Sequence, residues 1–197
     1  NLKFMATSCC PSWSVMAKKE FPEFANVSLE DFYLSMNAVK PGLRRITADE
    51  VSYCLHVILR YELERDCFAG KLEVGDLRNA WNDLSEKYLG LRPSNDTEGV
   101  LQDMHWAGGM LGYFPSYALG NAYGAQILRR MQQDIDVFGQ VKEGDLSQVL
   151  EWLKTHVFNC ASIMTPDEWI RHITGEGLNV NYYLDYLEEK FTAIYGL

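Results

Sequence analysis

Helical periodicity runs through nearly the whole chain and limits its fold more than any other feature. Glycine and proline stand mostly between segments of helical period, and few stretches alternate between polar and apolar residues at period two. We therefore predict an all-α fold. Helices without clear capping signatures are expected near residues 11–20, 75–89, 115–137, 144–158 and 180–194.

Three further helix starts carry capping signatures. Residues 165–168, Thr-Pro-Asp-Glu, combine a cap, a proline at the first helical position and a glutamate three residues after the cap. Ser28 opens a second helix. A capping box at residues 47–50, Thr-Ala-Asp-Glu, predicts a third helix that runs to Phe68, with Gly70 as its C-terminal stop. Because the chain has no internal repeat and no long linker, we predict a single helical domain over residues 1–197.

The charge balance argues against two classes of partner. The net charge is −9, and no basic cluster is larger than a pair of residues. Phosphate binding needs a concentrated positive face, so we predict no nucleic-acid partner and no anionic membrane surface as a partner. Residues 104–128 lack formal charge over a length that could span a bilayer, but the glycines, proline and polar side chains within them argue against a membrane span.

The cysteines and histidines favour neither a disulfide framework nor a metal site. Five cysteines form an odd set without a CxxC motif, which is typical of reduced thiols and predicts a cytoplasmic location. None of the four histidines has a second histidine three or four residues away, so no HExxH helix can form. A zinc catalyst needs three protein ligands and an open position. We therefore predict no metal site among this chain's own residues.

A polar stripe follows the predicted helix after residue 48. Its members share one face at helical spacing: Asp49, Tyr53, His56, Arg60 and Glu64. Two interpretations are open, a solvated face and a face that lines a cavity. The first is preferred here because charged stripes on helices usually face water.

Residues 99–120 gather polar and aromatic side chains around a glycine-rich turn. If residues 102–106 are helical, Gln102 and His105 are neighbours on one face. His105 is then either a buried histidine satisfied by a local carboxylate, the favoured interpretation, or a donor kept available for a ligand. In the second case the glycines let the backbone pass close to a ligand, and Tyr113 and Tyr117 present hydroxyl groups from an apolar wall.

Two long motifs in this region carry a family resemblance. One reads Gly-x-x-Gln-Asp-x-His-Trp, here with Gln102, Asp103 and His105; the other reads Ile/Val-Arg-x-x-Ala-Asp-Glu, matched at Arg45 and at residues 48–50. Segments such as GYFPSYALGN and LDYLEEKFTAIYGL agree as well. From about residue 20 to its end, the chain resembles the C-terminal part of the thermostable, Taq-type zinc metallocarboxypeptidases.

The resemblance implies a helical fold that lines one side of a substrate groove, and an enzyme that releases single residues from peptide C-termini. It implies that Arg45, with its planar fork of donors, binds the terminal carboxylate together with Tyr113 and Tyr117. His105 becomes the catalytic candidate, binding the carboxylate or stabilising the tetrahedral intermediate. Four further residues are expected to orient these donors: Asp49, Glu50, Gln102 and Asp103.

The sequence also departs from the family. The HExxH helix and the following HES(G)Q segment, which supply the zinc ligands and the general base of the family, are absent, and the chain begins just past the second of them. Arg44 replaces an aliphatic residue of the arginine motif. Zinc is therefore expected in the full-length protein, with ligands outside this chain, and the chain alone is expected to be an inactive fragment that depends on the missing N-terminal half of the enzyme.

Two alternatives stay open beside this hypothesis. In the first, the chain is a short, non-catalytic relative that binds peptides or a partner protein. In the second, it is a structural helical domain, with the tyrosines and His105 in an ordinary core. In the leading hypothesis, loss of the partner half exposes apolar surface, so we also expect a homodimer or aggregation.

Overall fold

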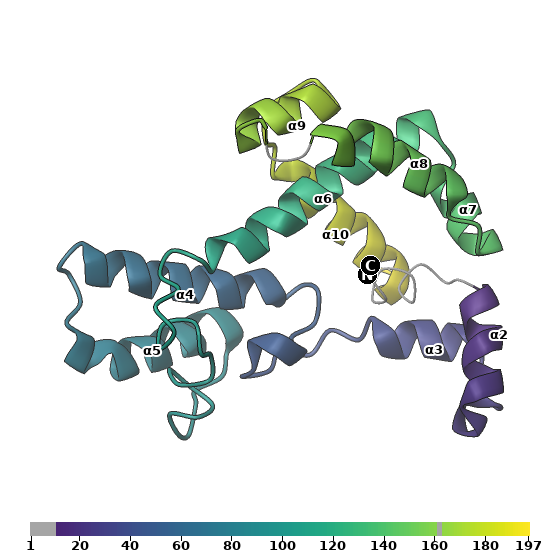
Figure 1. Cartoon of the computed structure of the whole chain (residues 1–197). Helices are drawn as coiled ribbons and strands as arrows, with labels where there is room; N and C mark the ends of the chain where they lie inside the picture. Colours follow the sequence, from purple (N-terminus) through teal and green to yellow (C-terminus); the bar gives the residue numbers. More distant parts are fainter. Residues whose placement is uncertain (1–10, 161–162) are drawn as a thin grey trace. The chain divides into compact units, whose positions relative to one another are not determined.

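The structure, a computed structural model, describes residues 11–160 and 163–197, and all regular secondary structure in these residues is helical (Figure 1). The predicted all-α class is confirmed. The longer helices are α2 (Pro11–Glu20), α3 (Leu29–Met36), α4 (Tyr53–Phe68), α5 (Leu77–Leu89), α6 (Pro115–Asp134), α7 (Val137–Glu143), α8 (Ser147–His156), α9 (Pro166–Thr174) and α10 (Asn181–Tyr195). Short 3-10 turns are η1 (Pro22–Phe24), η2 (Arg45–Thr47), η3 (Val74–Asp76) and η4 (Phe158–Cys160).

Contacts between the helices divide the chain into two compact units. One consists of residues 1–37 and 121–197, and the other of residues 38–120. The second unit contains both signature motifs and all the residues predicted to form the site. The prediction that residues 1–197 act as a single domain stays a prediction.

Helices α4 and α5 form the frame of unit 38–120 and lie side by side (Figure 1). Their contact buries Leu59, Leu63 and Trp81 almost completely. Partly buried apolar side chains surround these three, including Val100 and Trp106 from the segment that follows α5. Burial of such side chains is the main favourable term in folding. The same core therefore attaches the 99–114 segment to the helix pair.

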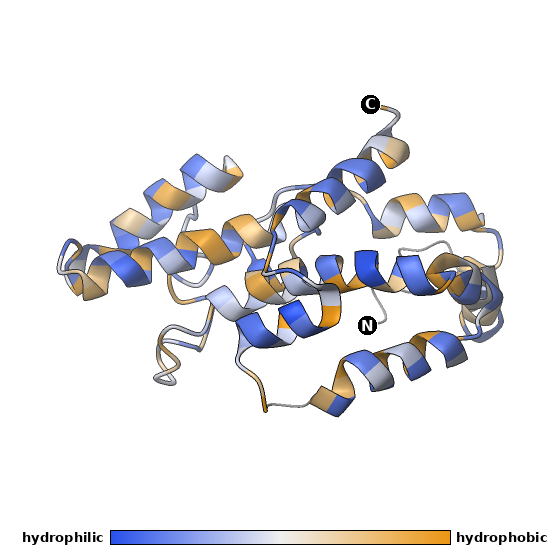
Figure 2. Ribbon diagram, turned by 90° about the horizontal axis from the view of Figure 1, so that it is seen from above, coloured by the Kyte–Doolittle hydropathy of each residue, from blue (hydrophilic) through white to orange (hydrophobic). Residues whose placement is uncertain are grey.

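The other unit has its own core. Seven buried side chains from α6, α7, α8 and α9 form it: Ile127, Met131, Val137, Val141, Trp152, Ile170 and Ile173. Figure 2 shows hydrophilic and hydrophobic residues mixed along each helix, as expected for helices with one buried face. Within the described residues, none of the helices has the length and apolar character needed to cross a bilayer.

Two of the three predicted caps are confirmed. At α9 the Thr165 side chain accepts from the backbone N–H of Glu168, and the Glu168 carboxylate accepts in return from the Thr165 N–H at 2.8 Å. At α3 the Ser28 hydroxyl accepts from the N–H of Asp31 at 2.9 Å. Each arrangement satisfies a helix N–H group that has no partner inside the helix.

The predicted capping box at residues 47–50 is wrong. Thr47 ends the 3-10 turn η2, and α4 begins only at Tyr53. Ser52 stands at the N-cap position of α4, and its side chain makes no cap bond. The turn before it is held by Asp49, whose carboxylate accepts from the N–H groups of Val51 and Ser52 at 2.9 and 2.8 Å and whose carbonyl accepts from the N–H of Tyr53. The sequence misplaced the helix start because threonine and aspartate are both good N-terminal caps. The predicted C-terminal stop is confirmed, with Gly70 at φ +66°.

The predicted helix over residues 115–137 is too long. α6 ends at Asp134, and a separate helix, α7, begins at Val137. The Asp136 side chain caps this new helix by accepting from the N–H of Gly139 at 3.0 Å. The sequence signal for the end of α6 was Asp136, a good N-terminal cap that lies within a stretch of helical periodicity.

No disulfide is formed within the described residues, where the cysteines are Cys54, Cys67 and Cys160. Cys9 and Cys10 lie outside the described residues. The cytoplasmic location inferred from cysteine usage stays a prediction.

The turn before α4 gives a direct test by mutation. Asp49→Ala removes the acceptor for the N–H groups of Val51 and Ser52 and should lower the free energy of unfolding by roughly 1–2 kcal/mol. Thr47→Ala, which removes a side chain exposed in the preceding turn, should change it by less than about 0.5 kcal/mol. Urea unfolding monitored by circular dichroism measures both, and a larger loss for Thr47→Ala would reverse the assignment.

Candidate functional site

The two signature motifs, more than fifty residues apart, bind each other. The Gln102 side-chain oxygen accepts from the backbone N–H of Arg45 at 3.1 Å, and its amide nitrogen donates to the carbonyls of Leu43 and Glu98 at 3.0 and 2.8 Å. Gln102 thus holds the backbone on which Arg45 stands. These contacts are compatible with the orienting role predicted for Gln102, which stays a prediction.

The carboxylate of Asp103 is shared between two arginines. Its Oδ1 accepts from Nε and Nη2 of Arg45 at 3.1 and 2.9 Å, and its Oδ2 accepts from Nε of Arg60 at 2.6 Å. All three side chains are buried, with Arg60 at 0 % exposure. We call Arg45, Asp103 and Arg60 the arginine–aspartate cluster.

The surroundings shift the pKa values of this cluster in different directions. Burial opposes the charge of Arg45, but its hydrogen bond to Asp103 and the attraction of that carboxylate outweigh burial and raise its pKa. Burial dominates at Arg60 and lowers its pKa to about 10, against the attraction of Asp103. At Asp103 burial is outweighed by the two arginines, which lower its pKa. All three groups are therefore charged at neutral pH.

The polar stripe on α4 is buried, which contradicts the preferred interpretation of a solvated face. His56 is 1 % exposed, Arg60 is fully buried and Glu64 is nearly so. The guanidinium of Arg60 lies between two aromatic rings, 4.6 Å from the centroid of Trp81 and 5.3 Å from that of Phe114. A signal for this burial was available in the sequence, because the other faces of α4 also carry large apolar residues. Two of these, Ile58 and Tyr61, are exposed.

Reasoning from the sequence did not include Arg60 and Tyr53 among the candidate site residues, but both contact them. Arg60 completes the cluster, and the hydroxyl of Tyr53 accepts from Nη1 of Arg45 at 3.2 Å. Both belong to the stripe that the spacing identified. The stripe is buried because it contacts the 99–114 segment. The helical periodicity of α4 gives no information about that contact.

His105 and Tyr117 lie beside the cluster. His105 Nε2 is 3.0 Å from the hydroxyl oxygen of Tyr117, and the Arg45 guanidinium carbon is 4.9 Å from the centroid of the Tyr117 ring. The ring of His105 also packs on Phe114, at 4.5 Å between centroids. Burial raises the pKa of Tyr117, so its hydroxyl stays protonated and can donate.

The histidine matches neither sequence interpretation fully. Its Nδ1 is buried and 3.9 Å from Asp103 Oδ1, too far for a hydrogen bond, and it has no hydrogen-bond partner within the described residues. The favoured interpretation, a histidine satisfied by a local carboxylate, is therefore wrong. The ring is instead held by aromatic contacts and by Tyr117.

The segment that carries His105 is a series of turns, so the conditional helix over residues 102–106 does not form. Gly99 allows the close approach that starts it: a side-chain carbon there would lie 3.2 Å from the Asn95 carbonyl oxygen. Further on, Gly112 adopts φ +73° and donates its N–H to the buried carboxylate of Glu64. α4 therefore holds this segment at two points, through Arg60 and through Glu64.

The remaining predicted residues lie at the edge of this arrangement. Tyr113 is 46 % exposed, and its ring is 5.4 Å from that of Tyr117 and 5.7 Å from that of His105. One carboxylate oxygen of Asp49 holds the turn before α4, and the other accepts from the Ser52 hydroxyl at 2.7 Å. Glu50 is half-buried in the same turn. The orienting roles of Asp49 and Glu50 stay predictions.

The described residues do not suit a catalytic metal. They contain no group of three histidine, cysteine, aspartate or glutamate side chains placed to hold an ion. Zinc requires at least three such ligands, so this segment by itself does not fit the metal that the resemblance implies.

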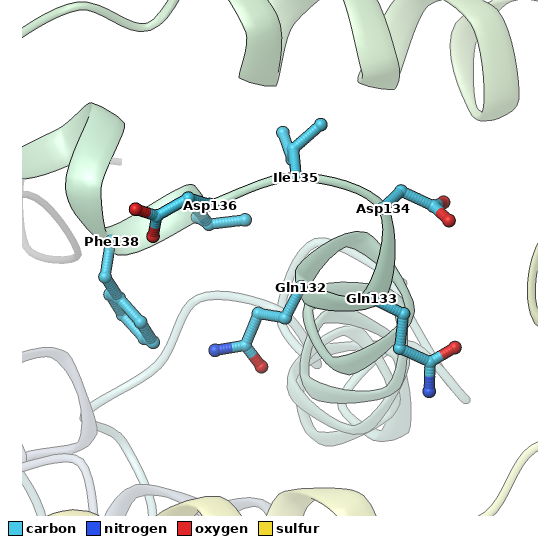
Figure 3. A pocket seen from close by; sticks show the side chains of 7 residues that line it. Gln132, Gln133, Asp134, Ile135, Asp136 and Phe138 are labelled. Atoms are coloured by element: carbon cyan, nitrogen blue, oxygen red, sulfur yellow. The ribbon is translucent and has the colours of Figure 1, made fainter.

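A surface hollow of about 390 Å³ lies in the other unit, at the turn between α6 and α7 (Figure 3). It is lined by residues 132–138, and Ile135 points away from Gln132 and Gln133. None of the predicted site residues contributes to it.

Comparison with known proteins decides the family. The sequence model described as carboxypeptidase Taq (M32) metallopeptidase matches residues 12–191. The chain belongs to this family.

Its similarity to individual M32 proteins extends over nearly all of its length. It is 43% identical over 176 residues to carboxypeptidase 1 of Bacillus subtilis and 39% identical over 181 residues to thermostable carboxypeptidase 1 of Thermus thermophilus. The structure matches that of the M32 carboxypeptidase from Deinococcus radiodurans with a TM-score of 0.91 at 37% identity, over 98% of this chain.

The coverage of these relatives is partial. The matches include 89% and 91% of this chain but only 35% and 36% of the two curated relatives, and 39% of the Deinococcus chain. The chain thus corresponds to a fragment of an M32 carboxypeptidase. The M32 family consists of metallopeptidases, which are hydrolases.

His56 makes the stability of this unit depend on pH. Burial, and then the charge of Arg60, lower its pKa to about 4, so between pH 4 and 6.5 the unfolded chain binds a proton that the folded chain does not. Its contribution is complete above pH 6.5 and is lost as the pH falls to 4, roughly 3 kcal/mol in the free energy of unfolding.

Two measurements check this contribution. In an NMR titration the ring signals of His56 should move near pH 4, and movement near pH 6.5 would contradict the account. Denaturant unfolding at pH 7 and pH 4.5 should show a smaller pH dependence for His56→Gln than for the original chain. His172→Gln, which removes an exposed histidine, is the matched control and should leave the pH dependence unchanged.

Proposed function

We propose that the whole protein is a metal-dependent carboxypeptidase that releases single residues from peptide C-termini. In this proposal the present chain supplies the carboxylate-binding wall of the substrate groove, formed by Arg45, His105, Tyr113 and Tyr117. The observation that carries it is the arginine–aspartate cluster, which places two guanidinium groups on one carboxylate directly beside Tyr117 and His105. An exopeptidase must recognise a free α-carboxylate, and a cationic surface with hydroxyl donors has the matching chemistry.

The individual roles follow from this geometry. Arg45 provides the positive charge, and the hydroxyls of Tyr117 and Tyr113 donate hydrogen bonds to the carboxylate oxygens. His105, linked to the Tyr117 hydroxyl, binds the carboxylate or stabilises the oxyanion of the tetrahedral intermediate. Gln102 and Asp103 keep Arg45 in place from behind.

The metal of the whole protein is proposed to be zinc, held by residues outside this chain. The described residues contain no group of three metal-binding side chains, so their proposed role does not involve holding the metal. What they contribute is recognition and orientation of the peptide end, which converts binding energy into a defined position of the scissile bond.

Peptide binding tests the proposal on the chain itself. Acetyl-trialanine with a free carboxylate should bind more tightly than its C-terminal amide, measured by NMR titration, and Arg45→Ala should abolish the difference. Arg44→Ala, at the exposed neighbouring arginine, is the control and should leave the preference intact. Equal binding of the two peptides by the original chain would contradict the proposed wall.

A hydrolysis assay separates the fragment from a complete enzyme. The isolated chain, supplied with Zn²⁺, should release no alanine from the same peptide, because its residues supply no ligand trio for the metal. Release of alanine detected by mass spectrometry would overturn the proposed division of labour.

The alternative, a short non-catalytic relative that binds peptides or a protein partner, shares the binding result. The gene distinguishes them: an HExxH motif encoded upstream in frame supports the enzyme, and an open reading frame that starts near Asn1 supports the binding protein.

We further propose that apolar side chains of unit 38–120 are covered by the rest of the protein, or by a second copy when this chain is alone. Ile46, Leu101 and Met104 are each more than two-thirds exposed. Large apolar surface favours association. Sedimentation velocity at high concentration should therefore show dimers or larger species, and a clean monomer would contradict this proposal.

A further inference from the structure

Arg60 is a cation that touches neither solvent nor any ligand. It is fully buried, its Nη1 donates to the His56 carbonyl at 2.6 Å, and its Nε donates to Asp103. Trp81 and Phe114 cover its guanidinium group at 4.6 and 5.3 Å. Any effect of Arg60 on a bound peptide must therefore pass through Asp103.

The charges of the cluster explain what that effect is. Arg45 and Asp103 alone form a neutral pair, and a neutral pair has little net attraction for an anion. Arg60 occupies Oδ2 of the same carboxylate, so the cluster carries two positive charges and one negative charge, a net charge of +1.

Within the described residues, neither His56, Glu64 nor Asp49 forms an ion pair with the cluster. His56 is neutral at pH 7 because burial and the charge of Arg60 lower its pKa to about 4. Glu64, one turn beyond Arg60 on α4, is hydrogen-bonded to the Gly112 N–H and forms no ion pair with either arginine. The Asp49 carboxylate is occupied by backbone N–H groups and the Ser52 hydroxyl.

We propose that Arg60 is a positioning residue that offsets the charge of Asp103 from the buried side, so that Arg45 faces the peptide carboxylate as part of a net cationic cluster. This inference rests on the proposed function of the wall. It adds that the preference for a carboxylate depends on all three members of the arginine–aspartate cluster. Arg60 is required although it does not touch the peptide. In this view Asp103 holds Arg45 in place. Without Arg60, the negative charge of Asp103 would cancel the positive charge of Arg45.

Three variants of the chain test this inference. Arg60→Lys keeps the charge, Arg60→Met removes it at similar length, and Arg65→Met is the matched control, at an exposed arginine paired with Asp66 on the same helix. Each variant is first checked for folding by its NMR spectrum. The ratio of dissociation constants for acetyl-trialanine amide and acetyl-trialanine carboxylate is then measured at low salt.

The expected results differ between the variants. Arg60→Met should reduce the preference for the carboxylate by roughly tenfold, because the cluster becomes neutral at a short distance from the ligand. Arg60→Lys should keep the preference within about threefold, and Arg65→Met should keep it unchanged. The preference that remains in Arg60→Met should also depend less on salt than that of the original chain.

Two results would overturn the inference. One is a folded Arg60→Met that keeps the full carboxylate preference. The other is a folded Arg60→Lys that loses the preference, because its charge is retained; this result decides the matter even if Arg60→Met does not fold. If the original chain itself shows no preference for the carboxylate, the proposed function of the wall has failed instead.

Discussion

The shared carboxylate of Asp103 is the interaction on which the arrangement of unit 38–120 depends. It joins three segments that are separate in the sequence: the turn with Arg45, the middle of α4 with Arg60, and its own loop. Burying three charges is costly unless each is paired and hydrogen-bonded. Because both arginines pair with this one carboxylate, removal of Asp103 would leave two buried cations that repel each other. Arrangements of unit 38–120 that separate Asp103 from either arginine are therefore strongly disfavoured.

Around this centre, irregular backbone is held by side-chain hydrogen bonds. The 99–114 segment has no regular structure, but Gln102 clamps it to the 43–45 backbone and Glu64 accepts from Gly112. The ring of Trp106 packs edge to face against Trp81 and against Phe114. A loop held in this way can carry polar side chains in fixed positions on a rigid scaffold, which is the common arrangement of binding and catalytic groups.

The sequence predicted local features well and their partners poorly. The capping box of α9 was predictable because its donors and acceptors lie within four residues of one another. The start of α4 was not, since Thr47 and Asp49 both suit a cap and the choice depends on the 3-10 turn that brings Arg45 to Asp103. The stripe on α4 was correctly grouped onto one face. Its burial was missed because the desolvation of Arg60 becomes tolerable only when a distant carboxylate and two aromatic rings cover it.

The sequence by itself determined the helical class, most helix positions and the family, since periodicity, capping and motif spacing are all properties of residues close together in the chain. It also singled out the residues of the wall, although their roles stay predictions. Only the tertiary structure decided that the two motifs hydrogen-bond to each other, that Arg60 joins them, and that a charged helix face turns inward. The physical reason is that burial and pairing of charge are settled between segments distant in sequence, where local pattern carries no information about which partner will be present.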